Sequence, residues 1–155
     1  MNAAALEAFI LEHIPLTRAI SLRVLDADAE SLTLGAPLGP NVNDKGCAFG
    51  GSLASLLTLA GWGLVRLRLG EAADDSEIYV QDSVLRYSAP VWSDLRVRAR
   101  LAEGESWQHF RQAFASRGRA RVQLIATALL DDGSAATTLE ARFAAFRRQE
   151  SRDVA

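Results

Sequence analysis

The sequence predicts an α+β fold in which an antiparallel sheet packs against one long buried helix. A run of nineteen residues without a charge, residues 47–65, is long enough for a helix that is enclosed by the protein. After this run the apolar pattern changes to alternation, which is typical of half-buried strands. Turn residues at Pro90, Gly104, Gly118 and Asp131-Asp132-Gly133 separate the alternating segments.

Length and charge limit the classes of protein to consider. The chain has 155 residues, which suits one domain (expected over residues 1–148) with a frayed tail at residues 149–155. Its net charge is −2, and its sixteen arginines and one lysine are scattered, so no nucleic-acid partner is expected. Residues 1–14 lack the basic region and cleavage site of a secretory signal. The single cysteine excludes an intramolecular disulfide and fits a reducing cytoplasm.

The elements before the long helix are short. Residues 1–14 predict an amphipathic helix that ends at Pro15. Residues 19–25 and 31–36 alternate and predict two strands.

The long uncharged run reaches the length of a membrane span. Its glycines, serines and threonine, and the arginines that follow at positions 66 and 68, favour a core helix instead, so no membrane partner is expected. At 100° per residue, one face is a stripe of leucines and the opposite face carries small and polar residues, namely Gly51, Ser55, Thr58 and Trp62. Hydroxyls on such a face bond back to carbonyls one turn earlier, or the face meets a ligand or a partner subunit.

The rest of the chain predicts an antiparallel meander of about five strands. The alternating segments are residues 77–87, 94–101, 107–116, 120–130 and 135–146.

A glycine-rich block, N-D-K-G-C-A-F-G-G-S at residues 43–52, precedes the long helix. The first turn of a helix has backbone N–H groups without acceptors and a partial positive charge, so it can hold a developing oxyanion. Glycine lets a substrate carbonyl approach these amides. The spacing from Gly46 to Ser52 matches a phosphate-binding loop, but the required lysine is absent, which argues against a nucleotide at this loop. The alternative is a glycine turn that only lets the helix pack tightly.

Three motifs together resemble a known family. These are N-x-x-G-x-x-F-G-G-S-L, the following A-G-W-G-L, and R-Y-x-x-P-V-x-x-D at residues 86–94. They resemble the hotdog-fold putative thioesterases that occur as the C-terminal domain of acetyltransferase-fused proteins and as stand-alone chains. The resemblance covers about residues 6–147 and implies a hotdog fold, a curved antiparallel sheet wrapped around a long central helix. It also implies the stand-alone form and a relation to malonyl–acyl-carrier-protein decarboxylases.

The wider hotdog thioesterases have the block N-x-x-G-x-x-H-G-G, with an acidic residue nine positions after the histidine. Here Phe49 stands in place of the histidine and Thr58 in place of the carboxylate. The resemblance implies that the amide of Gly50 points at the thioester carbonyl and that Asn43 positions the substrate or water. The expected catalytic residues are therefore Asn43, Gly50 and Thr58, and the expected substrate-binding residues are Phe49, Gly51, Ser55 and Arg86.

The expected reaction depends on which of the usual hotdog catalytic side chains this sequence retains. Without a general base, which typically contributes ~10²–10⁴-fold, hydrolysis would be slow. Decarboxylation of a malonyl thioester needs no base to start and collects charge on the thioester oxygen. The sequence and the resemblance thus favour malonyl–carrier-protein decarboxylation for fatty acid initiation, with acyl-CoA or acyl-carrier-protein hydrolysis as the alternative and a non-catalytic acyl-thioester binding module as the second. Acyl chain length and the choice of coenzyme A or carrier protein stay open.

Two side chains allow competing interpretations. Arg86 either pairs with a substrate carboxylate or phosphate or is a surface charge on the sheet. Cys47, beside the helix start, could form an acyl–cysteine, but neither His13 nor His109 is near it in sequence. With two histidines and one cysteine there is no metal-ligand spacing, so no metal or other cofactor is expected beyond the phosphopantetheine that the substrate carries.

Distance along the helix predicts a homodimer. Gly50 and Thr58 are eight residues apart, about 12 Å along a helix, too far for both to touch one thioester. A second copy can supply one of them, and a tetramer by further pairing is open. Arg117 and Arg119 flank the glycine of a predicted hairpin and are expected to be solvated. Exposed arginines near the mouth of the site could receive an acidic carrier protein.

Overall fold

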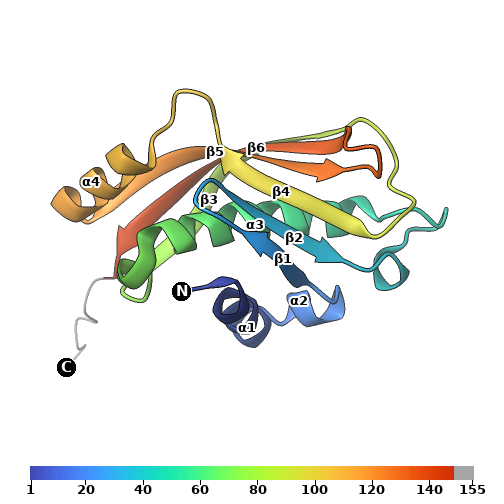
Figure 1. Cartoon of the computed structure of the whole chain (residues 1–155), viewed down its shortest axis with the longest axis horizontal. Coiled ribbons are helices and arrows are strands. Elements are labelled where there is room, and N and C mark those ends of the chain that lie inside the picture. Colours follow the sequence, from blue (N-terminus) through green and yellow to red (C-terminus); the bar gives the residue numbers. More distant parts are fainter. Residues whose placement is uncertain (149–155) are drawn as a thin grey trace.

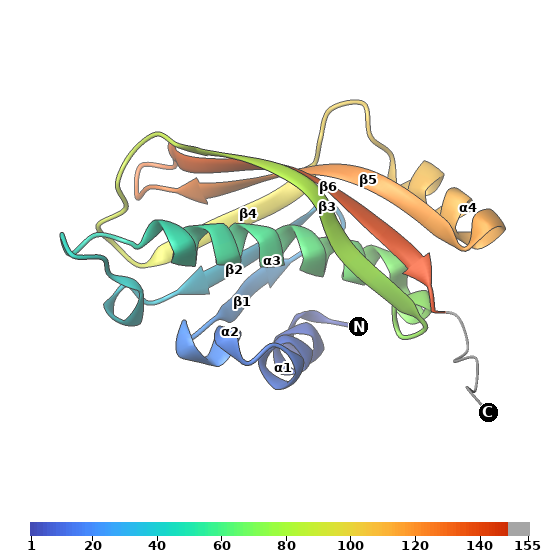
Figure 2. The same ribbon diagram turned by 180° about the vertical axis from the view of Figure 1, so that it is seen from behind.

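The computed structural model describes residues 1–148, so the predicted frayed tail lies outside the described residues. Six strands form one antiparallel sheet in the order β1-β2-β4-β5-β6-β3. A long helix, α3 (Gly50–Leu69), runs along the concave face of this sheet (Figures 1 and 2). The predicted α+β hotdog fold is therefore confirmed.

The first elements lie beside one edge of the sheet. Helix α1 (Ala3–His13) begins after Asn2, whose side-chain oxygen accepts a hydrogen bond from the amide of Ala5 at 2.9 Å. A short helix, α2 (Leu16–Ala19), follows, so the first strand, β1 (Arg23–Ala27), begins four residues later than predicted. Strand β2 (Ser31–Ala36) pairs with β1 and has the predicted bounds.

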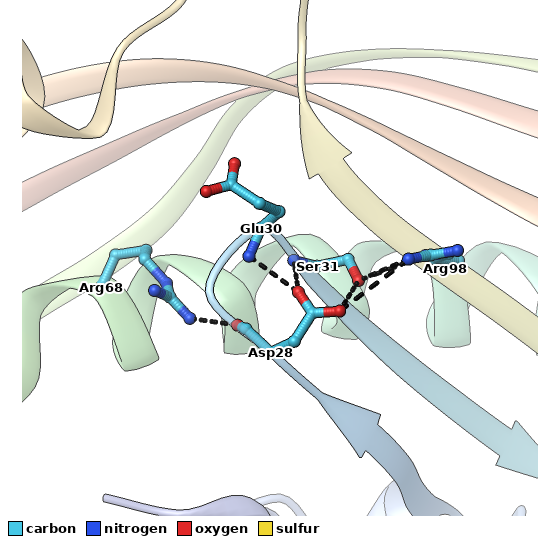
Figure 3. Close-up of polar contacts among 5 residues, drawn as sticks. All are labelled: Asp28, Glu30, Ser31, Arg68 and Arg98. Carbon is cyan, nitrogen blue, oxygen red and sulfur yellow. Dashed lines mark hydrogen bonds and ion pairs between the residues drawn. The ribbon is translucent and has the colours of Figure 1, made fainter.

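The turn between β1 and β2 is built around the carboxylate of Asp28 (Figure 3). Its Oδ1 accepts from the amides of Glu30 and Ser31, both at 2.7 Å, and its Oδ2 accepts from the Ser31 hydroxyl at 3.1 Å. These N–H donors hold the pKa of Asp28 below its usual value. Two arginines join the turn to other elements. Arg68 of α3 donates to the Asp28 carbonyl, and Arg98 of β4 donates to the Ser31 hydroxyl.

Helix α3 packs closely on the sheet because two of its glycines have no side chain. A Cβ at Gly61 would lie 2.6 Å from the ring of Phe143, and one at Gly63 would lie 2.7 Å from Leu32. The leucine stripe of α3 is buried as predicted, except that Leu67 is only partly buried against the core. The segment Gly50–Ala73 is long and apolar enough to cross a membrane, but 61% of its most apolar window is buried inside the protein, as in a core helix.

Strand order differs from the predicted meander. Strand β3 (Ser76–Tyr87) follows α3 through a short 3-10 helix, η2 (Gly70–Ala73), and pairs with β6 (Ala135–Arg147) at the far edge of the sheet. Strand β4 (Leu95–Leu101) lies beside β2, and β5 (Arg119–Leu129) lies between β4 and β6. Long-range strand pairing determines that β3 lies at this edge of the sheet, and the local alternation of apolar residues does not encode such pairing.

Strand β3 has a bulge where its pairing with β6 shifts between Val80 and Asp82. Before the bulge, Tyr79 lies on the outer, convex face, where its ring neighbours Phe146 at 6.3 Å between centroids. After it, Tyr87 lies on the inner face that carries α3. The extra residue reverses the alternation along the second half of the strand.

The predicted strand at residues 107–116 is wrong, because this segment forms helix α4 (Trp107–Arg117). Its buried residues are Trp107, Phe110 and Phe114, which follow helical spacing rather than alternation. The Ser106 hydroxyl caps its start by accepting from the amide of His109 at 3.3 Å. Gly118, at φ 65, ends the helix, so it is a helix cap and not the turn of a hairpin. Helix α4 lies beside the first part of β5, which β4 does not reach.

Candidate functional site

The glycine-rich block forms a tight loop that leads into α3. The amide of Asn43 donates to the carbonyl of Cys47 at 2.8 Å, and the amide of Gly46 donates back to Asn43 at 3.1 Å. Gly46 has φ 88, a conformation that favours glycine. The loop is tied to the core because Ala48 donates to the carbonyl of Val91 at 2.8 Å. These bonds fix where α3 begins.

Within this loop, Asn43 uses both ends of its side-chain amide. Its Oδ1 accepts from the amide of Lys45 at 2.8 Å, and its Nδ2 donates to Sγ of Cys47 at 3.2 Å. The residue therefore shapes the loop, and its predicted contact with substrate or water stays a prediction.

The start of α3 has no side-chain cap, in contrast with α1 and α4. Phe49 occupies the N-cap position and makes no side-chain hydrogen bond to the first turn. The amides of Gly50, Gly51 and Ser52 come before any intrahelical acceptor, so they are the donors that a bound oxyanion would use. The ring of Phe49 lies over Gly51, where an added Cβ would come within 2.3 Å of it.

Tyr87 joins this helix start to the end of β3. Its hydroxyl donates a hydrogen bond to the carbonyl of Gly50 at 3.0 Å. Tyr87 was not among the predicted site residues, although it stands in the R-Y-x-x-P motif. Its side chain points inward because of the bulge in β3, and the sequence pattern does not reveal where this bulge lies.

Exposed apolar side chains surround the start of α3. Phe49 is 55% exposed, Tyr87 54% and Trp92 61%. Trp92 follows Val91, whose carbonyl holds the glycine-rich loop. A single chain thus presents an open, apolar surface around the uncapped amides, suited to an acyl chain or to a second protein surface.

The small and polar face of α3 is half-buried along its length. Ser55 donates from its hydroxyl to the carbonyl of Gly51 at 2.9 Å, one turn earlier, which is the local satisfaction that the sequence allows. Trp62 donates from its indole nitrogen to the carbonyl of Ile78 in β3 at 3.2 Å. Thr58 is half-buried between them on the same face. The predicted roles of Ser55 and Thr58 toward substrate stay predictions.

Arg86 is not brought to the helix start. It follows the alternation of β3 onto the outer face, where it pairs with Glu140 at 2.8 Å. Both side chains are largely exposed. This geometry favours the surface-charge interpretation over the substrate contact.

The alternative nucleophile is poorly placed for covalent chemistry. Cys47 is 6% exposed, and its sulfur accepts from Asn43. His13 stacks on Phe9 in α1, and His109 lies on the exposed side of α4. Neither histidine contacts the thiol, so the structure supplies no base for it within residues 1–148.

Comparison with known proteins shows which family this chain resembles. A family model described as putative thioesterase (yiiD_Cterm) matches residues 3–147. A protein of unknown function from Chlorobaculum tepidum is 28% identical, with a TM-score of 0.86 over 94% of each chain. A putative thioesterase from Shewanella oneidensis is 27% identical, with a TM-score of 0.81 over 93% of this chain and 96% of that one.

The fold extends to more distant proteins. A thioesterase from Haemophilus influenzae is 13% identical, with a TM-score of 0.74 over 98% of this chain and 95% of that one, and this likeness shows the fold alone. Because the family model covers nearly all of the described residues, the chain belongs to the putative thioesterase (yiiD_Cterm) family of hotdog proteins.

Proposed function

We propose that this protein acts on acyl thioesters, with the thioester oxygen bound by the first amides of α3. The observation that carries the proposal is the uncapped helix start, held at a fixed place by Tyr87 and by the glycine-rich loop. One aligned oxyanion donor contributes roughly 3–4 kcal/mol of transition-state stabilisation. The family and the thioesterase named among the relatives support the same chemistry.

Hydrolysis is the reaction that the family description favours. It requires water to attack the thioester carbonyl, with the oxyanion held by the amide of Gly50. Phe49 and Thr58 offer no group that takes a proton near neutral pH, so the rate would depend on oxyanion binding and on the positioning of water.

Decarboxylation of a malonyl thioester is the second candidate, and the same two side chains favour it. The carbon–carbon bond to the carboxylate breaks, carbon dioxide leaves, and the electron pair forms an enolate with its charge on the thioester oxygen. The enolate then takes a proton from water to give the acetyl thioester. The amides of α3 would stabilise this enolate, and Phe49 would help to desolvate the departing carboxylate.

A homodimer formed through β3 would complete the site. This edge strand is twelve residues long, and it leaves Tyr79, Val80 and Val84 between 42% and 53% exposed. A long, apolar, unpaired edge favours pairing with another strand. Antiparallel pairing of β3 with its copy would bring a second α3 near the first and supply the Thr58 that one chain holds about 12 Å from Gly50. Sedimentation of wild type against Val84→Lys tests this, since lysine on the edge should favour the monomer.

The decisive experiment removes one N–H without changing the helix. Gly50 is the first helical residue and Phe49 before it is extended (φ −66, ψ 132), so Gly50→Pro fits the backbone and lacks only the donor. Gly50→Ala is the matched control because it adds a Cβ but keeps the N–H. We expect Gly50→Pro to lower kcat by roughly 10²–10³-fold.

Both variants are assayed with acyl-CoA and malonyl thioesters, with free thiol and carbon dioxide measured separately. Thiol release that depends on Gly50 supports hydrolysis, and carbon dioxide release supports decarboxylation. Equal rates in the two variants would contradict the oxyanion role, and no turnover by wild type would indicate a binding module.

A further inference from the structure

A groove lies at the opposite end of the molecule from the start of α3. It runs between α4 and the first residues of β5 and the last of β6, and two adjoining cavities of about 450 and 590 Å³ share Arg117, Arg119 and Phe146. Its floor includes Ala113 and Phe146, the latter 39% exposed. The groove therefore has apolar residues in its floor and arginines at its border.

Three guanidinium groups border this hollow without visible neutralisation. Arg117, Arg119 and Arg121 are exposed, and within residues 1–148 none of them forms an ion pair. By contrast, Arg86 and Arg142 on the same sheet are paired with Glu140 and Asp82. Arginine binds phosphate oxygens in a bidentate manner.

One carboxylate also borders the groove. Glu77 lines its far side, where it accepts a hydrogen bond from the Tyr79 hydroxyl at 3.0 Å. Tyr79 and Phe146 lie near each other on the same face. The groove thus offers the ring of Phe146, with Tyr79 beside it, for a planar base and three arginines for phosphates.

We propose that this groove binds the adenine nucleotide of a coenzyme A thioester, with its phosphates on Arg117, Arg119 and Arg121. The inference rests on the proposed function, because a nucleotide reaches the protein here as part of the thioester substrate. Helix α3 has 20 residues, so its start lies about 30 Å from the groove in the same chain. The groove would therefore serve the site of the second copy.

Strand register supports this arrangement. If β3 pairs with its copy around its midpoint, Tyr87 of one chain lies opposite the Ser76 end of the other. From there Glu77 pairs with Phe146, and Phe146 pairs with Arg119. Three strand spacings of about 4.8 Å therefore separate Tyr87 of one chain from the β5 of the other chain that carries Arg119. This distance is about 14 Å, which an extended pantetheine arm covers. Tyr87, Glu77, Phe146 and Arg119 lie at or next to the ends of their strands. The arm therefore passes around the end of the sheet and not through it.

Calorimetric titration with adenosine 3′,5′-bisphosphate tests the groove without requiring turnover. The variant is Arg119→Gln with Arg121→Gln, and the matched control is Arg96→Gln with Arg100→Gln, two exposed arginines of β4 on the same face. We expect binding to weaken at least tenfold in the groove variant and to be unchanged in the control. No binding to wild type, or equal loss in both variants, would overturn the proposal.

Steady-state kinetics then test whether the groove binds the nucleotide of a substrate that reacts at the start of α3. The groove variant should raise KM for an acyl-CoA about tenfold but leave KM for the same acyl group on N-acetylcysteamine, which has no nucleotide, unchanged. Loss of bisphosphate binding with an unchanged KM for acyl-CoA would overturn the link to the substrate. Loss of binding to an acidic carrier protein alone would assign the arginines to a protein surface instead. Because the titration needs no catalysis, it tests the groove even if the protein lacks the proposed activity.

Discussion

The hydroxyl of Tyr87 donates to the carbonyl oxygen of Gly50 at 3.0 Å, so the last residue of β3 holds the first residue of α3. Helix α3 and strand β3 are also joined where Trp62 donates to the carbonyl of Ile78, and they are connected in sequence through η2 at the opposite end of α3. The bond from Tyr87 therefore fixes the position of the candidate oxyanion site relative to the edge strand.

Replacing Tyr87 with phenylalanine should weaken activity more than stability. A typical hydrogen bond contributes about 0.5–1.5 kcal/mol, so we expect kcat/KM to fall roughly threefold to tenfold while the free energy of unfolding changes by under about 1 kcal/mol. Tyr79→Phe is the control when both variants are assayed with an acyl-N-acetylcysteamine, which has no nucleotide, because that hydroxyl bonds Glu77 on the outer face, away from the helix start. Similar kinetics in the two variants would argue against a role for Tyr87 at the helix start.

Introducing a carboxylate at position 58 should increase hydrolysis. Thr58→Asp places a general base where the wider hotdog enzymes have one, and we expect thiol release to rise by roughly 10²-fold. Thr58→Asn has nearly the same shape but takes no proton. If the aspartate and asparagine variants release thiol at equal rates, position 58 does not face the reacting carbonyl.

Adding a methyl group at Gly61 should destabilise the fold. The new Cβ would lie 2.6 Å from the ring of Phe143, and overpacking of a core typically costs about 1–3 kcal/mol. Gly39→Ala is the control, because nothing lies within 4 Å of its Cβ position. Urea unfolding of both variants measures the difference, and a stable Gly61→Ala protein would mean that α3 can move away from β6.

The stability that Asp28 contributes should depend on pH. Its pKa is held below the usual 3.8, chiefly by the backbone amides of Glu30 and Ser31, so the ionised form stabilises the folded state. This contribution is present above the unfolded pKa and is lost as the pH falls through the lower folded value. Asp28→Asn should thus lower the urea midpoint at pH 7, and the gap should close in acid. An equal gap between the two midpoints at pH 7 and in acid would contradict this role of Asp28.

The sequence predicts what local spacing encodes. The nineteen uncharged residues indicate α3, and alternation indicates every strand of the sheet, with β1 beginning late. The segment of α4 was predicted as a strand, whereas its burial follows the helical spacing of Trp107, Phe110 and Phe114. The glycine pair at the helix start came from the motif, but Tyr87 did not, since its orientation depends on a bulge and on pairing with β6.

That bulge gives β3 a change of phase. Tyr79 lies an even number of positions before Tyr87, so a regular strand would present both rings on one side. The extra residue between Val80 and Asp82 sends the first toward the arginine groove and the second toward Gly50. One strand thereby serves two surfaces, and regular pairing of the same residues with β6, without the bulge, would bring Arg86 in place of Tyr87 to the helix start.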